Sequence, residues 1–296
     1  MEEKRNEERS LLMLVTAMLI YGTIGVFRRN IPLSSGLLVF WRGLLGGTFL
    51  LVYLGLTRRG RRKEIASMGA GKVLLFILTG MFIGINWMLM FEAYNYTTVA
   101  AASLCYYMAP IIVILLSPLL LRERLTLKKG ICALVAIMGM VLVSGVLGIS
   151  PEEAGQAGQL KGIALALGAA VLYASVVIMN KKVGKADIYW RTIIQLLSAA
   201  LVMIPYLIFT GGFRTGPVAP SALVLVLVLG IIHTGIAYTL YFGSIEGLKG
   251  QTVAIFSYID PVFAMFLSAV ILHESLSPAG GLGAVMILGA AILSEV

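Results

Sequence analysis

The chain is a succession of long apolar runs separated by short polar breaks. Ten runs can be delimited, at 11–27, 36–56, 73–92, 98–121, 129–148, 160–180, 190–210, 221–243, 252–272 and 279–295. Each run is long enough to cross a hydrocarbon core of ~30 Å, which takes about 20 helical residues. Open strands are excluded, because their backbone groups would find no partner in lipid. The pattern therefore predicts an all-α membrane protein with ten transmembrane helices.

Composition supports the membrane assignment. Only 12% of the 296 residues are charged and 59% are apolar, whereas a soluble protein carries about 25% charged residues. A net charge of +9 could indicate nucleic-acid binding, but the basic residues lie in the short breaks between apolar runs. Membrane proteins have this distribution. We therefore expect a lipid bilayer, and no nucleic acid, as a partner.

The basic residues also predict an orientation. With the N-terminus in the cytoplasm, 17 Lys and Arg fall on the inner side and 4 on the outer side; Arg42 and Arg191, at helix starts, complete the 23. The excess of positive charge inside predicts a multi-pass protein of the plasma (cytoplasmic) membrane with both termini cytoplasmic. The first run ends in Phe27-Arg28-Arg29 without a small-x-small cleavage site, so we expect an uncleaved first helix.

The chain contains an internal repeat. A shift of 151 residues aligns Pro110 with Pro261 and Glu123 with Glu274, at the same 13-residue separation. A shift of 149 aligns Phe40-Trp41-Arg42 with Tyr189-Trp190-Arg191 in a chain that has only three tryptophans.

Each unit of the repeat contains five runs. Because five is odd, the second unit must enter the membrane from the opposite face. We therefore predict two inverted five-helix repeats, at 1–148 and 161–296, joined by a linker at 149–160. In such architectures the substrate site lies between the repeats near the membrane midplane.

Two segments resemble a known family. Ala109-Pro110 with the following LLLRERLT (119–126), and YIDPVFAMFLSAVILHESLS (258–277), are similar to the ends of the two repeats of the drug/metabolite transporter (DMT) superfamily, EamA type. The likeness covers essentially the whole chain. It departs at Ala109, where the second repeat has Asp260, and at His273, a place often held by Gly.

The resemblance implies a secondary active transporter that works by alternating access. It implies an exporter or exchanger of small organic metabolites such as amino acids, amines or drugs. The substrate itself, the direction of transport and the coupling ion are left open.

Polar and aromatic side chains within the spans are the candidates for binding a substrate. Tyrosine and tryptophan can form the walls of a site for an amphipathic solute, or they can pad helix interfaces. The two Trp-Arg pairs place an arginine either in the cavity, where it recognises a carboxylate or phosphate, or at the membrane interface as an anchor. The candidates are Arg42, Asn86, Trp87, Tyr107, Arg191, His233, Tyr238, Tyr258 and Asp260.

A smaller set is considered for coupling and gating. A carboxylate within the membrane costs ~2.5–3.5 kcal/mol, so Asp260 should face protein or water; there it binds a cation, carries a proton, or ties helices together as a neutral acid. Glu92 is a second candidate proton carrier. Pro110 and Pro261 are expected to bend their helices. Glu123 and Glu274 are expected to be structural, holding a loop or a helix N-terminus.

No enzyme motif is present in the sequence. It has no phosphate-binding glycine loop, no HExxH and no paired-histidine metal motif, and Cys105 and Cys132 lie within apolar runs. We therefore predict no catalytic residue, metal or cofactor. Protons are the candidate coupling ion, because Asp260 and Glu92 could carry them. The alternatives are a lipid-modifying enzyme or scaffold, or a passive channel. Both a monomer and a homodimer remain open.

Overall fold

The described part of the chain is almost entirely helical. A computed structural model describes residues 2–24, 27, 31–57, 68–93, 95–97, 102, 105–143, 158–184, 186–214, 218–271 and 278–295. Within these ranges the helical segments are α1 (Glu2–Gly22), α3 (Ser35–Thr57), α5 (Ala70–Ala93), α7 (Ala109–Leu120), α8 (Leu127–Val143), α10 (Gln159–Val183), α11 (Ile188–Leu201), α12 (Met203–Thr210), α13 (Pro220–Gly230), η2 (Ile231–Ile236), α14 (Ala237–Gly247), α15 (Gly250–Phe256), α16 (Ile259–Ile271) and α17 (Pro278–Glu295).

These segments form the ten predicted spans. α11 and α12 make one span, α13, η2 and α14 another, and α15 and α16 a third. Five spans in the described ranges are long and apolar enough on their own to cross a membrane: Ser35–Leu56, Ala70–Ala93, Leu160–Val183, Ile188–Thr210 and Pro220–Gly247. The prediction of an all-α protein with ten transmembrane helices is thus confirmed. The bounds differ in places, since α1 already begins at Glu2 and its residues 5–9 are exposed and polar.

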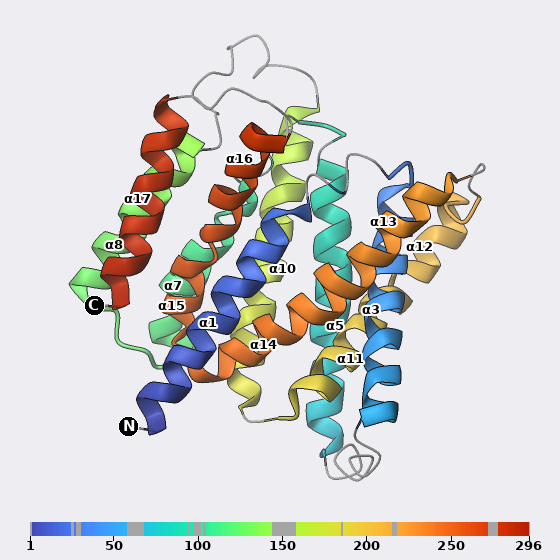
Figure 1. The fold of residues 1–296 in the computed structure, drawn as a ribbon, viewed down its shortest axis with the longest axis horizontal. Coiled ribbons are helices and arrows are strands. Elements are labelled where there is room, and N and C mark those ends of the chain that lie inside the picture. Colours follow the sequence, from blue (N-terminus) through green and yellow to red (C-terminus); the bar gives the residue numbers. More distant parts are fainter. Residues whose placement is uncertain are drawn as a thin grey trace.

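The two halves run in opposite directions. In Figure 1, α1 rises from the N-terminus while its counterpart α10 descends, and α8 rises while its counterpart α17 descends to the C-terminus. The two repeats, α1 to α8 and α10 to α17, are therefore inverted, as predicted. We call the end at which α1 begins the lower side, and the opposite end the upper side. Of the predicted linker, 149–157 lies outside the described residues, and its exact boundaries stay a prediction.

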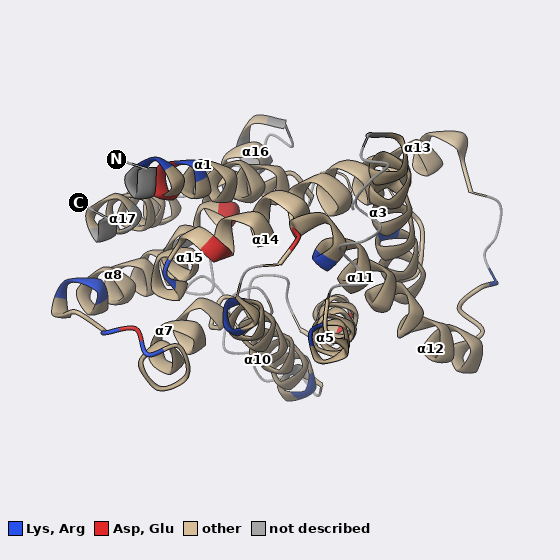
Figure 2. Cartoon of the chain, turned by 90° about the horizontal axis from the view of Figure 1, so that it is seen from below, with Lys and Arg blue, Asp and Glu red and all other residues tan. Residues whose placement is uncertain are grey.

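The repeats interleave, and their contacts come in matched pairs. α5 packs on α10 as α14 packs on α1, and α7 packs on α10 as α16 packs on α1. Counterparts also pack on each other, α3 on α11 and α8 on α17, and α7 packs on α15, the first part of its counterpart span. From below, α14 is seen at the centre, between α1 and α10 (Figure 2). A pseudo-twofold axis therefore runs through the middle of the molecule, between the repeats.

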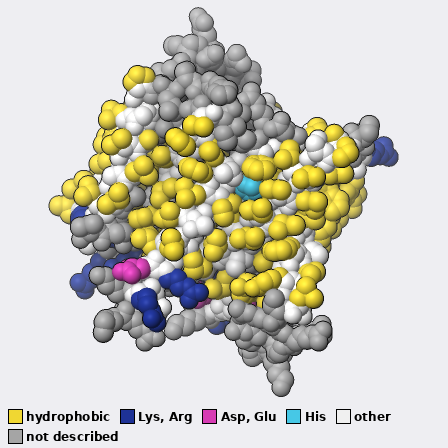
Figure 3. Space-filling model, viewed as in Figure 1, with side chains coloured by type: hydrophobic (Ala, Val, Ile, Leu, Met, Phe, Trp, Pro, Cys, Tyr) yellow, Lys and Arg dark blue, Asp and Glu magenta, His cyan; other side chains and the backbone are white. Residues whose placement is uncertain are grey.

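The outside of the bundle is apolar. Large hydrophobic side chains face outward from many helices, among them Phe209 (90% exposed), Leu119 (77%) and Leu56 (76%). Figure 3 shows hydrophobic side chains over most of the described front face, with basic side chains gathered mainly at its lower left. Such a surface suits lipid in the middle and water at the ends.

Each repeat has a break just before its matched proline. Met108 ends a turn before α7, in which Pro110 is the second residue, and Ser257 and Tyr258 form a turn before α16, in which Pro261 is the third. Proline is tolerated in the first turn of a helix because the missing N–H has no partner to lose there. The helix is thus interrupted on the N-terminal side of each proline.

Candidate substrate-binding site

A cavity of about 360 Å³ lies between the two repeats. Its lining residues are Met18, Tyr21, Gly22, Ile24, Arg42, Trp87, Met90, Phe91, Tyr106, Tyr107, Ala109, Pro110, Tyr173, Tyr238, Ser257, Asp260 and Ala264. They come from the upper parts of α1, α3, α5 and α7, from the first half of α16, and from the middle of α10 and of the span that contains α14. The cavity therefore extends from the middle of the molecule toward the upper side.

Arg42 is the basic residue of this cavity. Its side chain belongs to α3, is only 3% exposed, and lies over the ring of Trp87 at 4.4 Å from the centroid. Its Nε donates a hydrogen bond to Oγ1 of Thr234 at 3.2 Å. Both contacts are with uncharged groups, so the guanidinium keeps its charge available for an anionic group. Because it is buried, Arg42 is not an anchor at the membrane interface.

Thr234 is positioned by an irregular turn. It lies in η2, a π-helical segment, where its Oγ1 donates to the carbonyl of Leu229, five residues earlier, at 2.7 Å. A π-helical turn inserts an extra residue into a helix and is frequent at functional sites. Here it brings a hydroxyl of the second repeat against the arginine of the first.

Repeat-equivalent aromatic residues meet at the cavity. Trp87 Nε1 donates to the hydroxyl of Tyr238 at 2.9 Å, and the hydroxyl of Tyr258 donates to the backbone carbonyl of Tyr107 at 2.9 Å. In each pair the partners are 151 residues apart, the period of the internal repeat. A residue can touch its own counterpart only near the axis that relates them, so the cavity lies on the pseudo-twofold axis.

Further tyrosines complete an aromatic wall. The hydroxyl of Tyr173 donates to that of Tyr241 at 2.6 Å, and the ring of Tyr21 packs edge-on against Tyr238 at 5.3 Å between centroids. Tyr106 contacts the ring of Tyr173 at 5.8 Å. The resulting wall is apolar with hydroxyl tips, which suits an amphipathic molecule.

Asp260 supplies a carboxylate to the same cavity. It lies in the first turn of α16 and is within electrostatic range of Tyr106 and Tyr238. Its counterpart Ala109 also lines the cavity, as does Pro110. The Asp260 carboxylate therefore lies close to the pseudo-twofold axis. The first repeat has Ala109 at the equivalent position and provides no carboxylate there.

Some predicted binding residues lie behind the cavity wall. Asn86 is buried, donates from Nδ2 to the carbonyl of Ala169 at 2.5 Å, and accepts from Tyr106 at 3.5 Å. Tyr258 is buried and donates from its hydroxyl to the backbone carbonyl of Tyr107. His233 lies in η2, where Nε2 is 2.6 Å from Thr23 Oγ1 and Nδ1 is 3.3 Å from the carbonyl of Val228. These residues hold lining elements in place and do not line the cavity themselves.

Arg191 and two of the coupling candidates, Glu92 and Pro261, are not among the residues that line the cavity. Arg191 is fully buried on the lower side, so the interfacial alternative is wrong for it too, but it does not reach the cavity. Glu92, near the end of α5, accepts from Asn95, and Pro261 is buried in the first turn of α16. Glu123 accepts from the backbone N–H groups of Gly250 and Gln251, the first residues of α15 in the other repeat. Glu274 lies outside the described residues.

The sequence interpretation missed two kinds of functional residue. Tyr21 and Tyr173 stand in the corresponding spans α1 and α10, where no aligned Pro, Glu or Trp drew attention to them. Glu246 lay beyond the predicted end of its span at 243, whereas α14 continues to Gly247. The signal that could identify Glu246 is an acidic residue in the last turn of one span opposite an arginine of a neighbouring span. Within the described ranges no three His, Cys, Asp or Glu side chains cluster as a metal site would require.

The fold and the cavity define the class: a multi-pass membrane protein of two inverted five-helix repeats, with a central cavity between them, as in secondary transporters. The chain belongs to the EamA-like transporter family, whose sequence profile matches residues 9–145 and 160–295. It is a membrane transporter of the drug/metabolite kind.

Relatives and a solved structure agree with this. The chain is 30% identical to the uncharacterized transporter YxxF of Bacillus subtilis (strain 168), over 90% of this chain and 83% of that protein. It is 24% identical to the protein RarD of Salmonella typhi, over 90% and 87%. A crystal structure with 21% identity superposes with a TM-score of 0.82 over 97% of both chains, which establishes the fold alone.

Proposed function

We propose that this protein is a secondary active carrier of small zwitterionic metabolites, with amino acids bearing apolar or aromatic side chains as the substrate class. One observation carries the proposal: a buried guanidinium, Arg42, and a carboxylate, Asp260, line one aromatic cavity between inverted repeats. The guanidinium matches a substrate carboxylate, the carboxylate matches a substrate ammonium group, and the aromatic wall matches the apolar remainder.

The carrier alternates between two states. The cavity extends toward the upper side, and most of the described basic residues of the breaks lie at the lower ends of the helices, which supports a cytoplasmic lower side and cytoplasmic termini in the plasma membrane. The described conformation is then the outward-facing one. Transport as export or exchange follows when the repeats rearrange and the same cavity opens to the lower side.

Protons are the proposed coupling ion, and Asp260 their carrier. An acid that faces a substrate ammonium group can release its proton when the substrate binds and take it up again after release. The exchange of one proton for one substrate at a single carboxylate couples their opposite movements without a second ion site.

Counterflow in proteoliposomes tests the proposed substrate class. Vesicles loaded with an unlabelled amino acid should accumulate the same labelled amino acid from outside, because a carrier, unlike a channel, is accelerated by substrate on the opposite face. The amide of that amino acid lacks the carboxylate, and its N-acetyl derivative lacks the ammonium group. Each should compete at least tenfold more weakly, since one charged site residue is left without a partner. Equal competition by all three compounds would refute the zwitterion assignment.

A further inference from the structure

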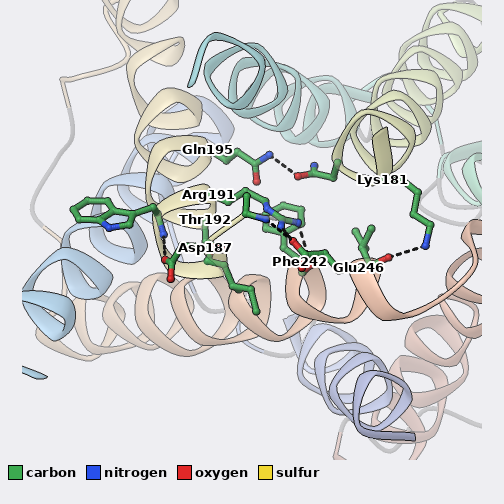
Figure 4. Close-up of polar contacts among 12 residues, drawn as sticks. Lys181, Asp187, Arg191, Thr192, Gln195, Phe242 and Glu246 are labelled. Carbon is green, nitrogen blue, oxygen red and sulfur yellow. Dashed lines mark hydrogen bonds and ion pairs between the residues drawn. The ribbon is translucent and has the colours of Figure 1, made fainter. Parts of the chain in front are cut away.

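Arg191 is the repeat counterpart of Arg42, but its surroundings differ. Its side chain is 0% exposed and lies on the lower side, between α11 and α14. One terminal nitrogen, Nη2, forms an ion pair with Glu246, and Nη1 donates to the carbonyl of Phe242 at 3.3 Å (Figure 4). Its Nε has no hydrogen-bond partner in the part of the chain that the structure describes. A buried guanidinium thus keeps one donor unused.

The ion pair belongs to a cluster that holds the join between α14 and α15. Lys181, near the end of α10, donates from Nζ to the carbonyls of Ile245 and Leu248. Glu123, from the other repeat, accepts from the N–H groups of Gly250 and Gln251 at 2.8 and 3.4 Å. Three charged side chains from three elements therefore hold residues 242–251. We call these contacts the lower latch.

The latch closes the lower side beneath the cavity. Every residue from Gly250 to Tyr258 is buried, so this segment is packed into the protein on the lower side of the cavity. Gln251 is 1% exposed, and neither polar atom of its side chain has a hydrogen-bond partner among the described residues. Such groups are costly to bury without partners, and opening the lower side would expose them to water or to a solute.

The inverted repeats indicate what the open lower side contains. When an inverted-repeat carrier changes state, the two repeats exchange conformations. The second repeat takes up the arrangement that the first had, and the first takes up the arrangement that the second had. Arg42 now lines the upper half of the cavity. In the opposite state Arg191 is the residue expected to line the lower half.

We infer that Arg191 is a second binding residue for the anionic group of the substrate, used when the lower side is open, and that the Glu246 carboxylate occupies it while that side is closed. This inference rests on the proposed function. A guanidinium binds a carboxylate through two N–H groups, and the Glu246 carboxylate stands in for that of the substrate. The anion thus passes from Arg42 to Arg191 as the repeats rearrange, and Glu246 returns to Arg191 after release.

The half-saturating substrate concentration, measured separately on each face of the membrane, tests the inference. The probe is the labelled amino acid with the highest counterflow rate, offered to the upper or the lower side of oriented vesicles. R191K should raise the half-saturating concentration about tenfold on the lower side, as expected for loss of a charge-assisted hydrogen bond, and less than twofold on the upper side. The matched variant R42K should show the opposite sidedness.

A second variant separates binding from a role as a strut. E246Q removes the negative charge that competes with the substrate for Arg191, so it should lower the half-saturating concentration on the lower side while R191K raises it. A shift in the same direction in both variants would overturn the inference. In the charge swap R191E/E246R the latch can re-form, but the lower-side half-saturation should stay raised; full recovery would mean that the pair is only structural.

Cysteine labelling reports on the latch without any substrate. Q251C, in a chain with C105S and C132S, replaces a side chain that has no hydrogen-bond partner among the residues that the structure describes. A membrane-impermeant maleimide added from the lower side should label it at least tenfold faster when E246Q is also present. Cys132, left in place in a separate variant, is buried in α8 and should remain unlabelled if the variant is not loosened generally.

The two readouts distinguish the two proposals. If no amino acid shows counterflow with the unaltered protein, the proposed substrate class fails, while faster labelling in E246Q would still support the latch. Labelling that is equally slow with and without E246Q would overturn the inference on its own.

Discussion

The packing of α11 against α5 gives a prediction whose size follows from the structure. Gly80 lies where α5 crosses α11, and a Cβ placed on it would stand 2.3 Å from the carbonyl oxygen of Gln195 and 2.7 Å from its Cα. These are backbone atoms of a helix interior and cannot rotate away. G80A therefore forces the two helices apart.

The expected loss of stability is about 2 kcal/mol. Overpacking of this kind costs about 1–3 kcal/mol, and a contact as short as 2.3 Å with backbone belongs at or above the upper end. Alanine is a better helix former than glycine and returns about 0.5–1 kcal/mol. The difference leaves G80A clearly less stable than the unaltered protein.

A matched control is available on α3. Gly55 is exposed, and its Cβ would meet no atom within 4 Å, so G55A should gain about 0.5–1 kcal/mol from helix propensity alone. Thermal unfolding in detergent, followed by tryptophan fluorescence, compares the variants. A G80A midpoint equal to or above that of G55A would refute the close packing of α5 on α11.

Three further changes address the cavity. R42K should raise the half-saturating amino-acid concentration about tenfold in counterflow, since lysine cannot both bond to Thr234 and stack on Trp87; an unchanged value would remove Arg42 from the site. D260N should abolish the pH dependence of transport, whereas E92Q, outside the cavity, should leave it intact; a pH profile preserved in D260N would exclude this acid as the proton carrier. Y238F leaves the Trp87 N–H without its acceptor and should cost about 1–3 kcal/mol of stability; an unfolding midpoint equal to that of the unaltered protein would contradict that hydrogen bond.

Most of the fold could be predicted because the bilayer imposes it. Ten apolar runs of sufficient length, with an odd number in each repeat, allow little besides two inverted bundles. Interruptions within spans could not be predicted in this way. The π-helical turn at 231–236 and the break at Val202 lie in runs as apolar as any other, and hydropathy does not distinguish their hydrogen-bond patterns.

The site could be predicted only in part, because the sequence is more symmetric than the structure. Arg42 and Arg191 follow tryptophan in the same way, yet one lines the cavity and the other is paired with Glu246. In the proposed alternating-access mechanism, one conformation opens one side of an inverted pair and closes the other, so equivalent residues differ in their contacts. No local pattern states which of the two is exposed to the cavity.

The division between axial and lateral residues explains how one cavity can serve both faces. Trp87 and Tyr238 touch each other on the pseudo-twofold axis, so exchange of the repeat conformations returns them to an equivalent arrangement. Asp260 and its counterpart Ala109 both line the same cavity, so a carboxylate near the axis is needed only once. Arg42 and Arg191 lie away from the axis, where equivalent positions face opposite sides. In the mechanism that we propose, a zwitterionic substrate then keeps its cationic end at Asp260 throughout, and only its anionic end changes partners.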